Sequence, residues 1–378
     1  MITFFSSAKP FRDRTAIQQR NAVNSWLRLG PEVEVMLFGI DEGVAEICAE
    51  YQLVAVPDVA CTEFGTPLLS DMYARAQKYS KFPLLCYINA DIILLEDFAV
   101  AAEMLAKRQA PFVMTGRRID VDFWRELNFG TDWRAEVRAA AAERGVPGAT
   151  VCLDYFLFRR DAIPAMPCFA IGRPAWDNWL IMDVRRRRVD LIDASRMVDP
   201  IHQNHDYGHV PLAKGTNWEG PEADRNRNLA LVDAPTFQPR LHSIYSATRV
   251  LTRWGVLPAW DLRHILWRIY VVLEYRNYRG RLLASYYYVQ VARHRATSAI
   301  HAKARKVSRW LRRSLAAYQR FARMVLKPLR GYRRLWTSST RAGVSLSAAT
   351  SPSLTSAAAA PPRAARTSNA ASEERPVK

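Results

Sequence analysis

The run at residues 84–95, LLCYINADIILL, constrains the fold of this chain more than any other stretch of its sequence. Its first five residues are all apolar, so both faces of the strand that they predict must be covered, and strands covered on both faces are typical of parallel sheets flanked by helices. Asn89 and Asp91 follow at the carboxyl end of this strand, where open α/β sheets bind their ligands. The sequence therefore predicts a buried central strand with a polar site at its end.

Short apolar runs and amphipathic stretches alternate along the first two thirds of the chain. Strands are predicted at 2–6, 33–40, 84–95, 112–116 and 151–158, and helices at 15–29, 43–51, 66–80 and 99–108. This alternation predicts an α/β fold with a mostly parallel sheet and helices on both of its faces. The chain has 378 residues, of which 49% are hydrophobic, and can bury a large core.

Charge divides the chain at about residue 240. Residues 1–240 hold 28 Lys and Arg against 32 Asp and Glu, a net charge of −4, whereas residues 241–378 hold 26 against 4, a net charge of +22. We therefore expect an α/β domain over 1–235, a basic amphipathic helical region over 236–336 and a disordered tail over 337–378, which is small, polar and Pro-containing.

The basic region is predicted to carry arginines opposite apolar and aromatic side chains, as at 262–273 and 303–326. Helices of this kind bind an anionic membrane surface, bind RNA, or pack on the rest of their own chain. The coincidence of aromatic and cationic faces favours the membrane. Because the first two thirds are slightly acidic, nucleic-acid binding is disfavoured as the function of the whole chain.

The cysteines and the amino terminus indicate a cytoplasmic protein. The five cysteines form no CxxC pair, which favours a reducing compartment. The chain begins with a strand-like run rather than a charged leader and a long apolar stretch, so we expect no signal peptide. No window approaches the ~20 uncharged apolar residues of a spanning helix. If the basic region binds lipid, the expected location is the inner face of a membrane.

Asp91 and the histidine cluster IHQNHDYGH at 201–209 offer one carboxylate and one imidazole. This pair is a usual way to hold a hard divalent ion that keeps open positions for phosphate oxygens, so the sequence indicates a site for Mn²⁺ or Mg²⁺. The alternative for Asp91 is a purely local role as the cap of the following turn.

These segments, together with IGRPAWDNWLIMDVRRR at 171–187, resemble the family 2 glycosyltransferases and related nucleotide-diphospho-sugar transferases of the GT-A fold. The resemblance covers about residues 1–230. It implies an enzyme that moves a sugar from a nucleotide-diphosphate donor to a hydroxyl acceptor, with a divalent metal. NADIIL stands where the family carries its short acidic metal motif, with Asn89 in place of the first aspartate. Asp91 and His202 are then the implied metal ligands.

The resemblance also implies donor-binding residues. Ser6 in TFFSSAKPF and Asp41 in LFGIDEG match the nucleotide pocket, and Asn89 is a weaker match. The residues themselves add two candidates. Thr66 opens a helix that would present backbone donors to a base or phosphate. Arg117 and Arg118 follow a strand end, where one of them, Arg117 in our assignment, would neutralise the diphosphate. A plain helix start and a solvated arginine are the alternatives.

Asp177 matches the general base of the inverting members. The acceptor hydroxyl has a pKa far above 7 and must lose its proton as it attacks the anomeric carbon, so a carboxylate is needed beside it. The alternative is that Asp177 only caps a helix. Around the acceptor, which can be a glycan, a lipid-linked sugar or a protein hydroxyl, we expect Asp154, Trp176 and Asn178. The expected process is polysaccharide biosynthesis.

A nucleotidyltransferase of related fold is the competing class of enzyme. Such an enzyme is expected to have a glycine-rich phosphate loop with a lysine near the amino terminus. SSAKPFRD has the lysine but no glycine, which favours the glycosyltransferase.

Overall fold

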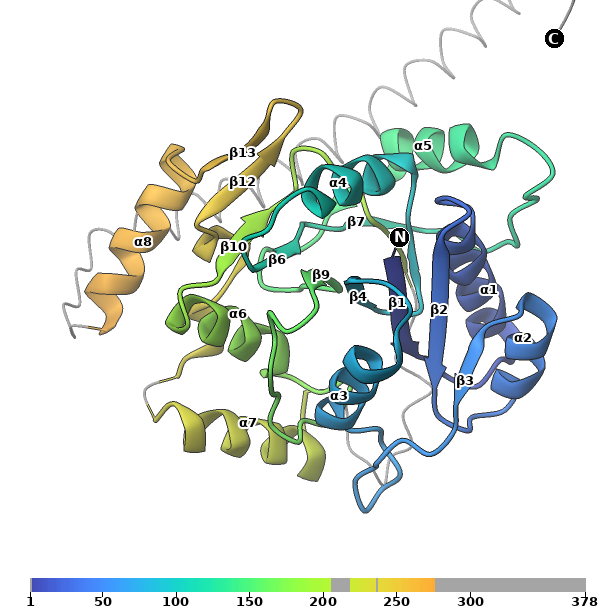
Figure 1. Cartoon of the computed structure of the whole chain (residues 1–378), viewed down its shortest axis with the longest axis horizontal. Helices are drawn as coiled ribbons and strands as arrows, with labels where there is room; N and C mark the ends of the chain where they lie inside the picture. Colours follow the sequence, from blue (N-terminus) through green and yellow to red (C-terminus); the bar gives the residue numbers. More distant parts are fainter. Residues whose placement is uncertain (1, 205–217, 236, 276–378) are drawn as a thin grey trace, which may run out of the picture. The chain divides into compact units, whose positions relative to one another are not determined.

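The computed structural model describes residues 2–204, 218–235 and 237–275 (Figure 1). Its main sheet has the strand order β13-β12-β10-β6-β9-β4-β1-β2-β3. Only β9 and β13 in this sheet run antiparallel to their neighbours. The strands are β1 (Ile2–Ser7), β2 (Val33–Phe38), β3 (Val54–Val56), β4 (Leu84–Ile88), β6 (Phe112–Thr115), β9 (Tyr155–Arg159), β10 (Asp190–Asp193), β12 (Arg249–Thr252) and β13 (Gly255–Pro258).

A smaller sheet has the order β5-β11-β7-β8. It is formed by β5 (Ile92–Ile93), β7 (Ile119–Val121), β8 (Val146–Pro147) and β11 (Ile201–Gln203). β11 pairs antiparallel with β5 and parallel with β7, and this register sets His202 opposite both Ile92 and Asp120. The small sheet thus brings together three segments that lie far apart in the sequence.

Helices cover both faces of the main sheet, as the alternation of the sequence predicts. One layer holds α1 (Asp13–Leu27), α2 (Val44–Tyr51) and α4 (Glu96–Ala106), and the other holds α3 (Leu69–Tyr79), α6 (Trp176–Arg186) and α7 (Pro221–Asp233). Successive strand residues face opposite layers, so Phe4 packs in the first and Phe5 in the second. The α/β fold class is therefore confirmed. α5 (Trp133–Arg144) packs on the small sheet through Trp133 and Val137.

The predicted strand at 84–95 is broken into two. β4 ends at Ile88, a turn closes with the backbone N–H of Ile92 donating to the carbonyl of Asn89 at 3.2 Å, and β5 follows. Both strands are fully buried, as the apolar run predicts. The turn places Asp91 where the main sheet passes into the small one.

The expected domain boundary at 235, and the expectation of a wholly helical region after about 240, are wrong. After η2 (Pro239–Leu241) and η3 (Ile244–Ser246), β12 pairs in parallel with β10 and so extends the main sheet, and β13 folds back on it. Val250 and Leu251 of β12 are buried because the edge of β10 needs both a hydrogen-bonding partner and cover.

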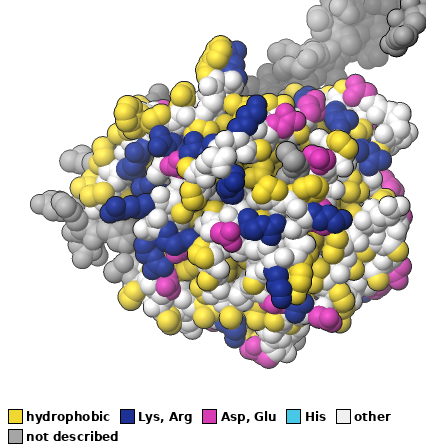
Figure 2. Space-filling view, in the orientation of Figure 1, with side chains coloured by type: hydrophobic (Ala, Val, Ile, Leu, Met, Phe, Trp, Pro, Cys, Tyr) yellow, Lys and Arg dark blue, Asp and Glu magenta, His cyan; other side chains and the backbone are white. Residues whose placement is uncertain are grey.

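The helical part of this expectation is confirmed at α8 (Leu262–Tyr275), which follows the hairpin, and one compact unit of the chain runs to Tyr288. In Figure 2 the tip of the β12–β13 hairpin projects from the described surface. The rest of 236–336 and the tail at 337–378 lie outside the described residues. Among the described helices, none has the length and hydropathy to cross a membrane.

The corrected boundary predicts the outcome of two truncations. A chain ending at residue 235 should lose cooperative thermal unfolding, because β10 would become an edge strand and the apolar side chains beneath β12 would be exposed. A chain ending at residue 288 should melt near the temperature of the full chain. Circular dichroism melts of both would check this, and a cooperative melt of the shorter chain at the full-length temperature would contradict it.

Candidate functional site

Polar side chains gather at one edge of the main sheet. β1, β2, β4, β6 and β10 are parallel, so their carboxyl ends meet at this edge. β9 runs the other way and begins there, directly after Asp154. The backbone N–H of Asn89 donates to the carbonyl of Asp154 at 2.9 Å, which joins the end of β4 to the start of β9. Ligand sites of open α/β sheets lie at such an edge.

Arg118 links the carboxylates of this edge. Its Nη1 donates to both carboxylate oxygens of Asp154 at 2.9 Å, and its Nε lies 2.8 Å from Oδ1 of Asp120. Burial alone would lower the pKa of the guanidinium, but the charges of Asp154 and Asp120 raise it above its usual value. Arg118 is therefore a permanent cation between two carboxylates.

Two further side chains hold Asp154 in place. The amide of Asn89 donates to Oδ1 of Asp154 at 2.8 Å, and the hydroxyl of Tyr87 donates to Oδ1 of Asn89 at 2.8 Å. Asp154 is buried, and it lies at the centre of a hydrogen-bonded network rather than on an open surface. The predicted acceptor-binding role of Asp154 stays a prediction. The side chain of Asn89 contacts the carboxylate of Asp154.

His202 is held by a carboxylate on the neighbouring strand. Its Nδ1 lies 2.9 Å from Oδ1 of Asp120, and the side chain is 7% exposed. Burial alone would lower the pKa of this imidazole, but the hydrogen bond to Asp120 and the negative charge of Asp91 raise it above its usual value. Asp91 is also buried, with Nζ of Lys9 3.7 Å from its Oδ2. The two predicted metal ligands therefore lie close enough for their charges to interact.

Asp177 lies in the first turn of α6, and its Oδ1 accepts from the backbone N–H of Asn178 at 2.9 Å. Burial raises the pKa of this carboxyl to about 7, and the negative charge of Asp154 adds to the rise, against backbone hydrogen bonds that oppose it. Ala175, directly before the helix, has a φ of +81°, a left-handed conformation that is strained for a residue with a Cβ.

Tyr87 shows that three carboxylates converge. Burial raises the pKa of its hydroxyl far above the usual value, and the negative charges of Asp154, Asp91 and Asp177 raise it further. These aspartates come from three separate segments of the chain. The structure therefore brings the predicted metal ligand, the predicted base and a third carboxylate near enough for their charges to act on the hydroxyl of Tyr87.

The predicted donor-binding residues lie on the neighbouring strand ends. Ser6 is only 1% exposed, so its hydroxyl is buried, whereas the next residue, Ser7, is partly exposed. A Cβ on Gly39 would lie 3.7 Å from Oδ2 of Asp41 and 3.9 Å from Oγ of Ser7, so these two polar groups flank the glycine. The donor contacts of Ser6 and Asp41 stay predictions, and Ser7 is a further hydroxyl at the same strand ends.

Thr66 and Arg117 make structural contacts. The hydroxyls of Thr62 and Thr66 both bond to Glu222, which is paired with Arg173 at 2.6 Å and is 1% exposed. Arg117 donates from Nε to the carbonyl of Gly148 at 2.6 Å. Thr66 thus ties its loop to α7, and Arg117 braces the chain beside β8; their donor contacts remain predictions.

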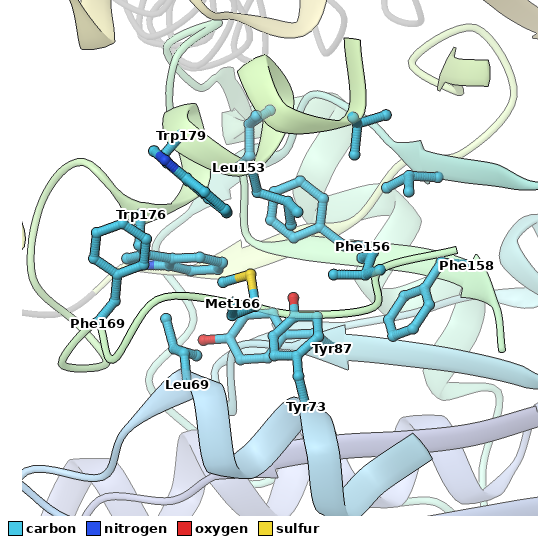
Figure 3. Close-up of a cluster of buried hydrophobic side chains, with 14 of the residues drawn as sticks. Leu69, Tyr73, Tyr87, Leu153, Phe156, Phe158, Met166, Phe169, Trp176 and Trp179 are labelled. Atoms are coloured by element: carbon cyan, nitrogen blue, oxygen red, sulfur yellow. The ribbon is translucent and has the colours of Figure 1, made fainter. Parts of the chain in front are cut away.

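Trp176 and Asn178 are not arranged as the acceptor site that the sequence predicted. Trp176 packs edge-on against Tyr87 and Phe156 in the core beneath α6 (Figure 3). Nδ2 of Asn178 donates to the carbonyls of Val151 and His242. Both side chains are buried by packing and hydrogen bonding to their own chain, and this corrects the assignment.

Sequence reasoning missed the roles of Lys9, Tyr87, Arg118 and Asp120. Arg118 and Asp120 are two residues apart on either side of Ile119, a spacing that puts both on one face of a strand. This two-residue spacing is the sequence signal that could have paired Arg118 with Asp120. The partner of Asp120 is His202, which the sequence separates from it by 82 residues, and only the pairing of β7 with β11 reveals it.

We call Asp91, Asp120, Asp154 and Asp177 the carboxylate cluster. A pocket of about 240 Å³ opens next to it, at Arg118. It includes Arg118, so a ligand in this pocket would lie against the same guanidinium that holds Asp154. The other charged residues that line it are Arg117, Arg196, Arg263, Asp193, Asp199, Asp261 and His264. The residues come from the ends of β6 and β10 and from the start of α8.

The residues at this edge can supply part of a metal shell. Within the described ranges, no group of three or more His, Cys, Asp or Glu side chains is arranged to hold a metal ion. Asp91 and His202 are two donors of the types that Mn²⁺ and Mg²⁺ accept. A metal at this place would need further oxygen ligands, which a nucleoside diphosphate provides.

No protein-family model and no curated protein sequence matches this chain. Three solved structures illustrate the similarities of fold. The chain is similar to residues 1–349 of TarS from S. aureus, at 13% identity and TM-score 0.33, over 54% of this chain and 58% of that one. It is also similar to the mannosyltransferase PcManGT from Pyrobaculum calidifontis in complex with GDP-Man and Mn²⁺, at 11% identity and TM-score 0.38, over 63% of this chain and 64% of that one.

The third is glucosyl-3-phosphoglycerate synthase from Mycobacterium tuberculosis with Mg²⁺ and UDP, at 12% identity and TM-score 0.37, over 63% of this chain and 80% of that one. The chain spans less than two thirds of the TarS fragment and of the mannosyltransferase. These matches are distant, and each has a TM-score below 0.5.

The position of Arg118 predicts that adjacent arginines differ in their effect on stability. Arg118→Met should lower the free energy of unfolding by about 3–5 kcal/mol, because it leaves Asp154 and Asp120 with an uncompensated charge. The matched control Arg117→Met loses only hydrogen bonds to carbonyls and should cost about 1 kcal/mol. Urea unfolding of both variants checks this, and equal losses would show that Arg118 does not hold the cluster.

Proposed function

We propose that this protein is a glycosyltransferase that moves a sugar, such as a hexose, from a nucleotide-diphosphate donor to a hydroxyl acceptor with inversion at the anomeric carbon. The convergence of Asp91, Asp154 and Asp177 around Tyr87 carries this proposal. Two of these carboxylates are balanced by nearby cations, Asp91 by Lys9 and Asp154 by Arg118. Asp177 is the carboxyl whose pKa stays high enough to exchange a proton near neutral pH.

Asp177 has the properties of a general base. A base works best when its pKa lies near the working pH, because it is then ionised and still basic enough to take a proton. A pKa of about 7 meets this requirement, whereas a carboxylate of ordinary pKa is a far weaker base. In the proposed reaction its carboxylate accepts the proton of the acceptor hydroxyl, the hydroxyl oxygen bonds to the anomeric carbon, and the nucleoside diphosphate leaves from the opposite face.

Asp91 and His202 fit a divalent metal. Asp120 holds Nδ1 of His202, and a carboxylate in this position is the usual support of a histidine that binds metal through its other ring nitrogen. Bound there with the diphosphate, Mn²⁺ or Mg²⁺ would neutralise the charge that develops on the leaving group. Lys9 lies near the same carboxylate and offers a second positive charge to phosphate oxygens.

The remaining donor contacts fit the ends of β1 and β2. Ser7 and Asp41 flank Gly39, and this places a hydroxyl and a carboxylate together for the hydroxyl and N–H groups of a nucleoside. The acceptor is proposed to enter from the pocket beside Arg118, because that residue is shared by the pocket and the carboxylate cluster. Arginines and aspartates both line this pocket, so an acceptor there would meet charges of both signs.

The base assignment predicts how Asp177→Asn affects catalysis. Asparagine keeps the shape and can accept the hydrogen bond from Asn178, but it cannot take a proton. Turnover should fall roughly 10²- to 10⁴-fold with donor affinity nearly unchanged. In the unchanged protein, kcat/KM should rise with pH through a midpoint near 7 and then level off, since the base must be ionised. Steady-state kinetics across pH measure both, and near-normal turnover of the variant would refute the assignment.

The pH dependence of stability reports the protonation of Asp177 independently of catalysis. Between its ordinary pKa and about 7, Asp177 binds a proton in the folded chain but not in the unfolded one, so its contribution to stability falls as pH rises through this window. Asp177→Asn removes the free-energy cost of ionising this carboxyl in the folded chain. The variant should therefore be more stable than the original protein by roughly 1–4 kcal/mol above pH ~8. The matched control on the same helix is Asp183→Asn. Asp183 pairs with Arg187, so that variant should lose stability and keep turnover.

The metal assignment predicts a loss of coupled binding. Asp91→Ala and His202→Ala should each weaken Mn²⁺-dependent binding of UDP or GDP about 10- to 100-fold, because each removes one protein ligand. The control Asp122→Ala removes an exposed carboxylate that contacts Asn204 and should change nothing. Calorimetric titrations with and without Mn²⁺ measure this. Unchanged affinity in both variants would overturn the metal site while leaving the base assignment standing.

A further inference from the structure

The end of the described chain carries an apolar face that the fold does not cover. α8 buries Trp267 and His264 against the rest of the unit. On its other side, apolar residues at spacings of three and four form a stripe whose members are 40–67% exposed: Leu262, Ile265, Ile269 and Val272. A soluble amphipathic helix normally turns such a stripe toward the core. Here the sequence pattern is confirmed, but the stripe faces outward.

Two tryptophans extend this face onto the neighbouring hairpin. Trp254 follows β12 at the hairpin tip and is 77% exposed, and Trp260, between β13 and α8, is 74% exposed. Leu257 of β13 is exposed as well. Figure 2 shows hydrophobic and basic side chains together on the projecting hairpin and over α8, whose places in the fold can be followed in Figure 1. We call these seven residues the hairpin–α8 face.

Positive charge accompanies this face. The guanidinium of Arg253 lies 4.5 Å from the ring centre of Trp254, and Arg263 is exposed next to Leu262. In sequence the face is followed by residues 276–378, which hold 22 Lys and Arg against 2 Asp and Glu. The face and its surroundings therefore combine exposed indoles, aliphatic side chains and a cationic field.

We propose that the hairpin–α8 face docks on an anionic lipid surface. Tryptophan prefers the boundary between lipid headgroups and acyl chains, where its ring is apolar and its N–H is hydrated. Aliphatic stripes bind the same boundary by burying apolar area, and basic residues add attraction to anionic headgroups. RNA would use the charge but would leave the four aliphatic side chains of the stripe in water. Lipid is the partner that satisfies all three features.

Docking would also place the pocket at the lipid surface. Asp261 and Arg263, which line it, alternate in sequence with Trp260 and Leu262 of the face. If the proposed glycosyl transfer holds, an acceptor anchored in the membrane could present its hydroxyl to this pocket. This consequence rests on the proposed function, whereas docking itself is a binding property that can be measured without any enzyme assay.

The test uses the full chain and vesicles of equal parts phosphatidylglycerol and phosphatidylcholine. A face variant carries Trp254→Ser, Trp260→Ser, Leu262→Ser and Ile269→Ser, none of them in the carboxylate cluster. A control variant carries Trp124→Ser and Val232→Ser, which remove exposed apolar side chains elsewhere. At about 0.5 M salt, where surface charges are screened beyond roughly 5 Å, co-sedimentation should weaken roughly tenfold or more in the face variant and stay unchanged in the control.

A second variant reports contact directly. Trp254→Phe with Trp260→Phe keeps the apolar area but removes two indoles, so it should bind vesicles normally while brominated lipids quench less of its tryptophan fluorescence. Vesicle binding by the face variant equal to that of the original protein would overturn the proposal, because the basic segment alone would then suffice. So would a change in oligomeric state or melting temperature without a change in vesicle binding, since the face would then be covered by protein.

Discussion

The arrangement of the site depends on one ionic contact, in which Arg118 lies between Asp154 and Asp120. Parallel strands bring their carboxyl ends to one edge, and here that edge collects four aspartates whose charges repel one another. A buried guanidinium with two carboxylate partners offsets this repulsion, because each partner lies within 2.9 Å. Without it, the segments that carry Asp154 and Asp120 would be forced apart.

The same contact gives the four carboxylates different charge environments. Asp154 and Asp120 share Arg118, and Asp91 lies near Lys9. Among the described residues, no ion pair is formed by Asp177, which is partly exposed and lies near the negative charge of Asp154. Carboxylates in one site with different environments take different protonation states. The unequal pairing is consistent with the raised pKa of Asp177, on which its proposed role as the base rests.

The small sheet gives the site its rigidity. His202 lies between β5 and β7, and its neighbour Gln203 is bonded to two other elements. The amide of Gln203 donates to the carbonyls of Gln18 and Asp91, and Nδ2 of Asn21 donates to its oxygen. These buried bonds tie β11 to α1 and to the turn after β4. His202, the proposed metal ligand, is thus carried by a strand that is hydrogen-bonded on both sides, as a site of fixed geometry requires.

The sequence by itself determined the α/β alternation and the position of Asp91 after a strand, because hydrophobic period and strand ends are local properties. The resemblance of its motifs to a family singled out Asp177 and His202. Only the tertiary structure decided which partners these residues meet. Asp120 reaches His202 through a strand pairing, and Trp176 and Asn178 are buried by packing. The sequence also predicted that α8 is amphipathic, whereas the burial of Trp267 and His264 decided which of its sides meets the core. A local pattern records which residues share a face, whereas the partner of that face depends on contacts between distant segments.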